Sequence, residues 1–149
     1  MFLSISMKHV YVFLLALQVI AFWESSPVVS GESKITVIIR NSLHDDLNAT
    51  IHCKSGEGND LGVHEVPNYS FNRATYDLVF EPNISHTTLY LCAISWKEAS
   101  LLYVFYSYKR DIERCGTHCL WDILNGGIVG YSTAPGFVSI YVKWPNHAN

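Results

Sequence analysis

Four cysteines and a set of histidines are the side chains of this sequence with the widest range of chemistry. The segment Cys115-Gly116-Thr117-His118-Cys119 brings three side chains of the types that bind zinc close together in the chain. No fourth cysteine or histidine follows at the spacing of a zinc finger. We therefore expect no metal site and no bound cofactor.

The other acid–base groups form no pattern that predicts catalysis. The histidines beyond residue 30, none of which lies in a ribonuclease-like His-Gly-Leu-Trp context, are His44, His52, His64, His86, His118 and His147. Three carboxylate pairs have a composition suited to glycoside hydrolysis: Asp45–Asp46, Glu57/Asp60 and Asp111/Glu113. Each pair lies in a predicted turn, where solvated charges are usual. The sequence also has no nucleophile elbow, P-loop or dinucleotide motif, and we predict that the protein is not an enzyme.

The first thirty residues have the pattern of a signal peptide. Lys8 precedes the apolar run 10–23, which is interrupted only by Gln18 and is shorter than the about 20 residues that span a membrane. Small residues then lead to Ser30, after which we place the cleavage site. The prediction is a signal peptide over 1–30 and one domain over 31–149, without stable membrane insertion.

The net charge excludes two classes of partner. With histidine counted as neutral, Lys8 and Glu24 are the only charged residues of the leader and cancel, so the charge of the whole chain, −3, is also that of residues 31–149. Nucleic acids and anionic membrane surfaces select basic faces. We therefore expect neither as the main partner.

The cysteines predict two disulfides in an oxidising compartment, since Cys53, Cys92, Cys115 and Cys119 all follow the leader. Three pairings are possible from sequence. We favour Cys53–Cys92, which closes a long loop worth about 4 kcal/mol, with Cys115–Cys119, which closes a tight turn worth about half as much. A bridge between residues four apart is sterically possible.

Three N-glycosylation sequons occur, at Asn48, Asn68 and Asn83. Residues 47–53 alternate so that Asn48 lies opposite the apolar face, and 69–73 alternate so that Asn68 lies opposite Tyr69. Asn83 follows Pro82 in a turn. We predict that all three asparagines point to solvent and carry glycans.

Short runs with alternating polarity, separated by turn residues, predict an all-β fold: a small antiparallel β-sandwich stapled by two disulfides. No amphipathic helix is predicted. Asn125-Gly126-Gly127 is a strong hairpin signal. The predicted strands are 34–41, 47–54, 61–66, 69–73, 77–80, 87–96, 101–108, 119–124, 128–131 and 137–144, with 87–96 and 101–108 as a central pair.

Two segments are candidates for binding. The dense charges after the aromatic strand 101–108 predict a polar loop that a receptor reads through Lys109, Arg110, Asp111, Glu113 and Arg114. Trp96, Trp121 and Trp144 have the chemistry of a sugar-stacking platform, but their alternation with other apolar residues favours a place in the core.

An ordered set of motifs behind the leader resembles the plant self-incompatibility S-protein family, over about 35–144. These motifs are His52-Cys53-Lys54-Ser55, Asp60-Leu61-Gly62, Tyr69-Ser70-Phe71, Cys92-Ala-Ile-Ser-Trp96, Phe105-Tyr106, Lys109-Arg110-Asp111 and Cys115-x-x-x-Cys119-x-Trp121. Pro67-Asn68 departs from the family, in which many members have glycine before the Tyr-x-Phe pair. The resemblance implies a secreted, disulfide-bonded plant β-sandwich; in poppies such proteins are the pistil signal that incompatible pollen recognises.

Together, these features predict a monomeric protein, secreted to the apoplast, that is a ligand for a cell-surface receptor protein, with pollen–pistil self-incompatibility signalling as its biological setting. An apoplastic carbohydrate-binding or defence-related module is the alternative. A secreted hydrolase is a third and weaker reading, because no catalytic motif supports it.

Overall fold

The computed structural model describes residues 33–145, which belong to one compact unit, Glu32–Asn149. The predicted signal peptide over 1–30 lies outside the described residues and stays a prediction. The strands are β1 (Ile35–Asn41), β2 (Ala49–Ser55), β3 (Asp60–Val66), β4 (Thr75–Phe80), β5 (Leu89–Trp96), β6 (Ala99–Ser107), β7 (His118–Leu124), β8 (Gly127–Gly130) and β9 (Ile140–Lys143). Two short helices, α2 (Tyr69–Asn72) and α3 (Tyr108–Cys115), interrupt this series.

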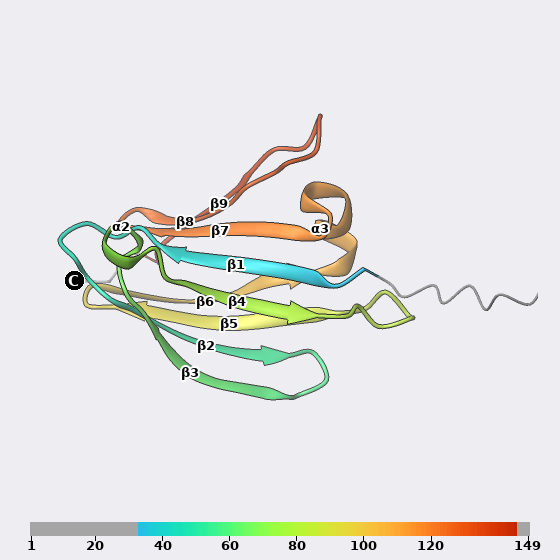
Figure 1. Ribbon diagram of the computed structural model, residues 1–149, viewed down its shortest axis with the longest axis horizontal. Helices are drawn as coiled ribbons and strands as arrows, with labels where there is room; N and C mark the ends of the chain where they lie inside the picture. The colour runs from blue at the N-terminus through green and yellow to red at the C-terminus, as the bar shows by residue number, and fades with distance from the viewer. Residues whose placement is uncertain (1–32, 146–149) are drawn as a thin grey trace, which may run out of the picture. The chain divides into compact units, whose positions relative to one another are not determined.

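The strands form two sheets that lie as two layers (Figure 1). One sheet has the order β4-β1-β7-β8-β9 and the other β3-β2-β5-β6. Neighbouring strands are antiparallel with one exception, the parallel pair β1–β7, in which Thr36 lies beside His118 and Asn41 beside Ile123. The predicted all-β fold with two disulfides is confirmed, with this one parallel pair added to an otherwise antiparallel arrangement.

The core lies between the sheets and follows from the period of two in the strands. In β1, every second side chain from Ile35 to Asn41 is buried. Trp121, Tyr106 and Phe105 are the largest fully buried side chains, and the ring centres of Phe105 and Trp121 are 4.9 Å apart. Burial of each large apolar side chain contributes about 1.5–3 kcal/mol to stability.

Several sequence predictions about local structure are wrong. The segment 69–73 is not a strand: α2 occupies it, with Asn68 as its N-cap and Arg73 in the left-handed region at its C-terminus. The expectation of no helix also fails at α3. The predicted strand 137–144 shrinks to β9, and Val138 is 86% exposed. Strands β5 and β6 do pair, but β6 is an edge strand.

Candidate recognition surface

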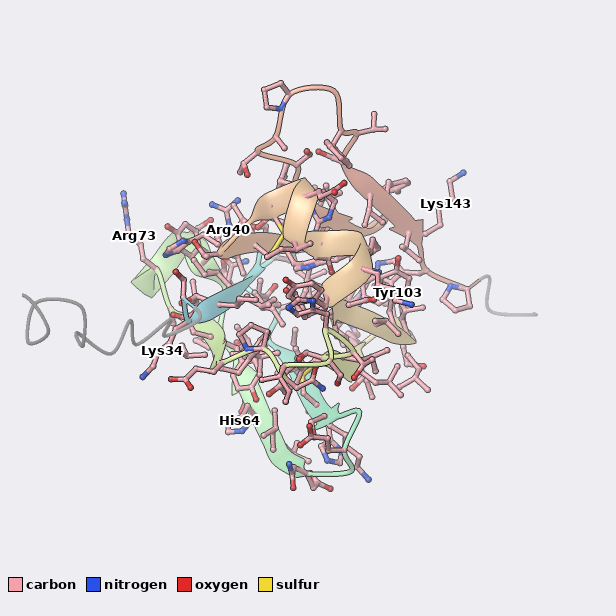
Figure 2. The ribbon with its side chains drawn as sticks, turned by 90° about the vertical axis from the view of Figure 1, so that its right-hand side faces the viewer. Lys34, Arg40, His64, Arg73, Tyr103 and Lys143 are labelled. Carbon is pink, nitrogen blue, oxygen red and sulfur yellow. A yellow bond between two sulfur atoms is a disulfide. The ribbon has the colours of Figure 1, made fainter. Side chains whose placement is uncertain are left out.

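Four connections lie at one end of the sandwich, which we call the loop end. They are residues 56–59, residues 81–88, α3 with residues 116–117, and residues 131–139. Strands β2, β4, β6 and β8 end there, and β3, β5, β7 and β9 begin there, on the right in Figure 1. Figure 2 looks onto this end. Connections at the end of a rigid sandwich are the usual place for binding residues.

The charged segment predicted as a receptor-reading loop is helix α3, and this changes the role of its residues. Lys109 and Glu113 are exposed, and the Arg110 side chain is 29% exposed. Asp111 is 0% exposed and Arg114 is 2% exposed. Asp111 and Arg114 therefore cannot touch a partner in this fold, so the sequence-based assignment of contact roles to these two residues is corrected.

The buried carboxylate of Asp111 accepts hydrogen bonds from the start of α3 and from two arginines of the helix. Its Oδ2 accepts hydrogen bonds from the Ser107 backbone N–H at 2.9 Å and Arg110 Nη2 at 2.7 Å. Its Oδ1 accepts from Arg110 Nε at 2.9 Å and Arg114 Nε at 2.8 Å. A buried carboxylate needs such partners, because an unpaired charge in the interior is costly. The arrangement holds the first turn of α3 and both arginines in fixed positions.

Trp121 lies against both arginines. The guanidinium carbons of Arg110 and Arg114 are 5.7 and 5.4 Å from the Trp121 ring centre, within the range of cation–π attraction. Arg110 also lies 5.6 Å from the ring centre of Tyr103, which Figure 2 labels. Gly130 is the neighbour of Trp121 in β8, and a Cβ atom there would come within 2.6 Å of the indole. Glycine at 130 is therefore required for this packing.

The connection 131–139 is anchored at its base and carries an exposed apolar side chain. The Arg114 carbonyl accepts hydrogen bonds from the backbone N–H of Thr133 at 3.0 Å and of Ala134 at 3.3 Å. Arg114 Nη1 donates to the Tyr131 carbonyl. Val138, which follows the turn closed by the Phe137 N–H and the Ala134 carbonyl, is exposed. The buried side of α3 thus positions an apolar segment that faces solvent.

The connection 81–88 is also ordered by its own side chains. Asn83 Oδ1 accepts a hydrogen bond from the Thr87 backbone N–H at 2.8 Å. The ring of His86 stacks on Tyr108, the first residue of α3, with centres 4.3 Å apart. Ile84 is 95% exposed. The loop end thus carries a second exposed apolar side chain on a constrained connection.

A hollow of about 460 Å³ lies between residues 56–59 and this connection. Its lining includes Glu57, Glu81, Asn83 and Tyr90, and no basic residue. Partial burial raises the pKa of Tyr90 above its usual value, and the carboxylate of Glu57 adds to this effect. The hollow can accept hydrogen bonds from hydroxyl or cationic groups.

Two disulfides support the scaffold, with the pairing favoured above. Cys53 and Cys92 lie opposite each other in β2 and β5 and are bonded. Cys115 and Cys119 join the end of α3 to β7. The second bond fixes the helix C-terminus, where Gly116 turns the chain with a positive φ.

The three sequons differ in the structure. Asn48 is exposed, and its side chain donates to the carboxylate of Glu65. Asn83 is partly exposed in its loop. Asn68 does not point to solvent as predicted: it is 5% exposed because the segment after it is a helical turn that it caps, instead of a strand.

A polar cluster that the sequence did not reveal lies on the outer side of the β1–β7 pair. Arg40 forms two hydrogen bonds of 2.6 Å with the carboxylate of Asp122, and the Tyr131 hydroxyl donates to that carboxylate at 2.9 Å. The contact with Asp122 raises the pKa of Arg40 (labelled in Figure 2). Arg40 and Asp122 are 82 residues apart, and only the parallel register brings them together.

The acid–base candidates do not gather in one place. His52 Nε2 lies 2.6 Å from Asp60 Oδ1 on the exposed β2–β3 hairpin. The backbone N–H of Gly62, together with His52, lowers the pKa of Asp60 to about 2. Asp45 and Asp46 lie exposed in a turn. Among residues 33–145, no three His, Cys, Asp or Glu side chains are arranged to hold a metal ion.

The three candidate tryptophans pack inward. Trp121 is fully buried, and Trp96 and Trp144 are half-buried, with ring centres 6.2 Å apart. Trp144 Nε1 donates to the Leu124 carbonyl at 2.8 Å. The core position that their alternation favoured is therefore the observed one. Over the described part of the chain, no helix is both long and apolar enough to span a bilayer.

Comparison with known proteins agrees with these features. Residues 36–144 match the family model described as plant self-incompatibility protein S1. The chain is 33% identical to S-protein homolog 5 of Arabidopsis thaliana over 63% of this chain and 69% of the relative. It is 32% identical to self-incompatibility protein S1 of Papaver rhoeas over 72% and 75%, and 30% identical to S-protein homolog 27 of Arabidopsis thaliana over 81% and 74%. The chain therefore belongs to the plant self-incompatibility protein S1 family.

Proposed function

We propose that this S-protein homologue is exported and acts as a protein ligand, binding a cell-surface protein through its loop end. The observation that carries the proposal is that connections at one end are held by buried hydrogen bonds and a disulfide while apolar side chains on them are exposed. Asp111 and the Cys115–Cys119 bond hold α3, while Ile84 and Val138 face solvent. A surface ordered before binding loses less conformational entropy when a partner docks.

The proposed contact residues are those of the loop end that reach solvent. Lys109, Arg110 and Glu113 contribute charge from α3, and Phe137 and Val138 contribute apolar area from residues 131–139. Large exposed apolar side chains beside polar ones are typical of protein-binding sites. We assign the protein no catalytic role.

Binding to intact cells tests this proposal. Labelled residues 31–149 are titrated onto protoplasts of the expressing tissue, and unlabelled protein is the competitor. We expect saturable binding that Val138→Asp and Lys109→Glu each weaken about tenfold, which is about 1.4 kcal/mol.

Lys97→Glu is the matched control, because it makes the same charge change in the exposed β5–β6 turn at the opposite end. It should bind like the unchanged protein. Non-saturable binding, or an equal loss for Lys97→Glu and Lys109→Glu, would contradict the proposal.

The hollow beside residues 81–88 favours a second candidate, a carbohydrate-binding module. Carboxylate, amide and phenol groups from Glu57, Glu81, Asn83 and Tyr90 surround it, and such groups bind sugar hydroxyls. A glycan array distinguishes the two: binding that Glu81→Gln abolishes would support this candidate, and an array without binding would dismiss it.

A further inference from the structure

Asn68 uses both polar atoms of its side chain inside the fold. Its Oδ1 accepts a hydrogen bond from the Ser70 backbone N–H at 2.9 Å, which caps α2. Its Nδ2 donates to the Leu43 carbonyl, in a contact that is buried. Because Asn68 is 5% exposed, a sugar on Nδ2 would have to displace residues that bury this side chain.

A second buried asparagine, Asn41, lies beside Asn68 and also forms hydrogen bonds with the backbone of neighbouring segments. Asn41 is 0% exposed and pairs with Asn68 through an isolated β-bridge. Its Nδ2 donates to the carbonyls of Leu47 at 2.7 Å and Val66 at 2.8 Å, and its Oδ1 accepts from the Leu43 N–H at 3.0 Å. The two asparagines hold these segments together, so a glycan at Asn68 would require several of these hydrogen bonds to break.

Asn48 and Asn83 are in a different situation. Nδ2 of Asn48 donates to the exposed carboxylate of Glu65, and Nδ2 of Asn83 donates to Thr87 Oγ1 at 3.0 Å. An amide nitrogen that has gained a sugar keeps one hydrogen, which is enough for one such contact. Unlike the buried contact of Asn68, both of these contacts are exposed, so there is room for the sugar. Both sites can therefore carry a glycan without loss of their hydrogen bonds.

We propose that the exported protein carries N-linked glycans on Asn48 and Asn83 and none on Asn68, an inference that rests on the proposed export. The donor is an oligosaccharide linked to a polyprenyl pyrophosphate. A bond forms between sugar C1 and Nδ2, the bond between C1 and the phosphate oxygen breaks, Nδ2 loses one proton, and the lipid pyrophosphate leaves. Chains modified at Asn68 before folding would be unable to close around Leu43.

A glycan on Asn83 determines which part of the loop end a partner can reach. Asn83 lines the hollow that also contains Glu57 and Glu81. A glycan attached there covers this hollow and leaves α3 and residues 131–139 as the open part of the loop end.

Three matched variants test the assignment by removing each sequon through its hydroxyl residue, so that every asparagine stays in place. Thr50→Ala, Ser70→Ala and Ser85→Ala all change exposed residues. The full chain is produced in plant cells, the protein in the medium is purified, and its glycopeptides are measured by mass spectrometry. We expect Thr50→Ala and Ser85→Ala to lose one glycan each, and Ser70→Ala to have an unchanged glycan mass.

A secreted, folded protein with Asn68 glycosylated in most molecules would overturn the assignment, and so would an unmodified Asn48 or Asn83. Asn68→Ala should lower the thermal unfolding midpoint and Ser70→Ala should not, which separates the structural role of Asn68 from its sequon. A second version of the protein, with the leader of a known secreted protein in place of residues 1–30, separates the two proposals. If only the version with its own leader stays inside the cell, the proposed export is contradicted. The glycan pattern is then still measured on the second version.

Discussion

Two aspartates of this protein make similar hydrogen bonds in opposite surroundings. Asp111 in α3 accepts hydrogen bonds from the Ser107 backbone N–H and from arginine side chains. Asp60 in β3 accepts hydrogen bonds from the Gly62 backbone N–H and from His52, which can gain a positive charge. Asp111 is 0% exposed, whereas the Asp60 side chain is 51% exposed. The comparison shows that solvent, more than the number of contacts, decides how strongly a charged cluster holds the fold.

The physical reason is what happens when a contact is lost. At Asp60, water replaces any missing partner, and exposed ion pairs contribute about 0–1 kcal/mol. At Asp111, the partner Arg114 has a side chain only 3% exposed, so it would remain charged in the interior without its counter-charge. The Asp60 carboxylate on the hairpin therefore contributes little to stability, whereas we expect the Asp111 carboxylate under the loop end to contribute much more.

The largest expected effect is that of Asp111→Asn, which keeps the shape of the side chain and removes its charge. Because both arginines lose their counter-charge, we expect the free energy of unfolding to fall by about 3–5 kcal/mol. Glu113→Gln makes the same change on the exposed side of α3 and should stay within about 0.5 kcal/mol. Chemical denaturation of the secreted proteins measures both, and equal losses for the two variants would refute the contrast.

An intermediate effect is expected for Gly130→Ala, which disturbs the Trp121 ring that packs against the arginines. The added Cβ would lie 2.6 Å from the indole, and overpacking of this kind costs about 1–3 kcal/mol. Gly56→Ala is the control, since its Cβ would meet Leu89 at an ordinary 3.4 Å. Thermal unfolding compares the two; a Gly130→Ala variant as stable as Gly56→Ala would show that the ring has room to move.

The smallest effect is expected at Asp60 and depends on pH. Its pKa is lowered from 3.8 to about 2, so its stabilising contribution is complete above about pH 4 and disappears as the pH falls through about 2. The difference in stability between the protein and Asp60→Asn should shrink over that range. NMR titration should also find a higher pKa for Asp60 in His52→Ala, still below 3.8, because the Gly62 N–H, the larger cause, remains. A titration of Asp60 near 4 in the unchanged protein would contradict this assignment.

The strands were largely predictable, because alternation of apolar side chains needs only neighbours in the chain. It correctly indicated β1, where every second residue is buried, and the Asn125-Gly126 turn between β7 and β8. The favoured cysteine pairing also agrees with the structure. The charged segment proposed for binding was predicted as a loop, whereas the structure has helix α3 there.

Helix α3 shows why that conformation was missed. An isolated helix of eight residues is unstable in water, so its charged run reads as a loop. The spacing of Asp111 and Arg114, three residues apart, was the available helical signal. Burial of that pair against Trp121, from a different strand, could not be seen in the spacing.

The sequence by itself determined the all-β character, the cysteines available for bonding and the family, since these depend on residue types and their order. Tertiary structure alone decided that Asp111 and Asn68 are buried, and that Arg40 meets Asp122. These outcomes depend on which distant segments exclude water from a side chain, and solvent exclusion is a property of the packed sheets that no local stretch of sequence contains.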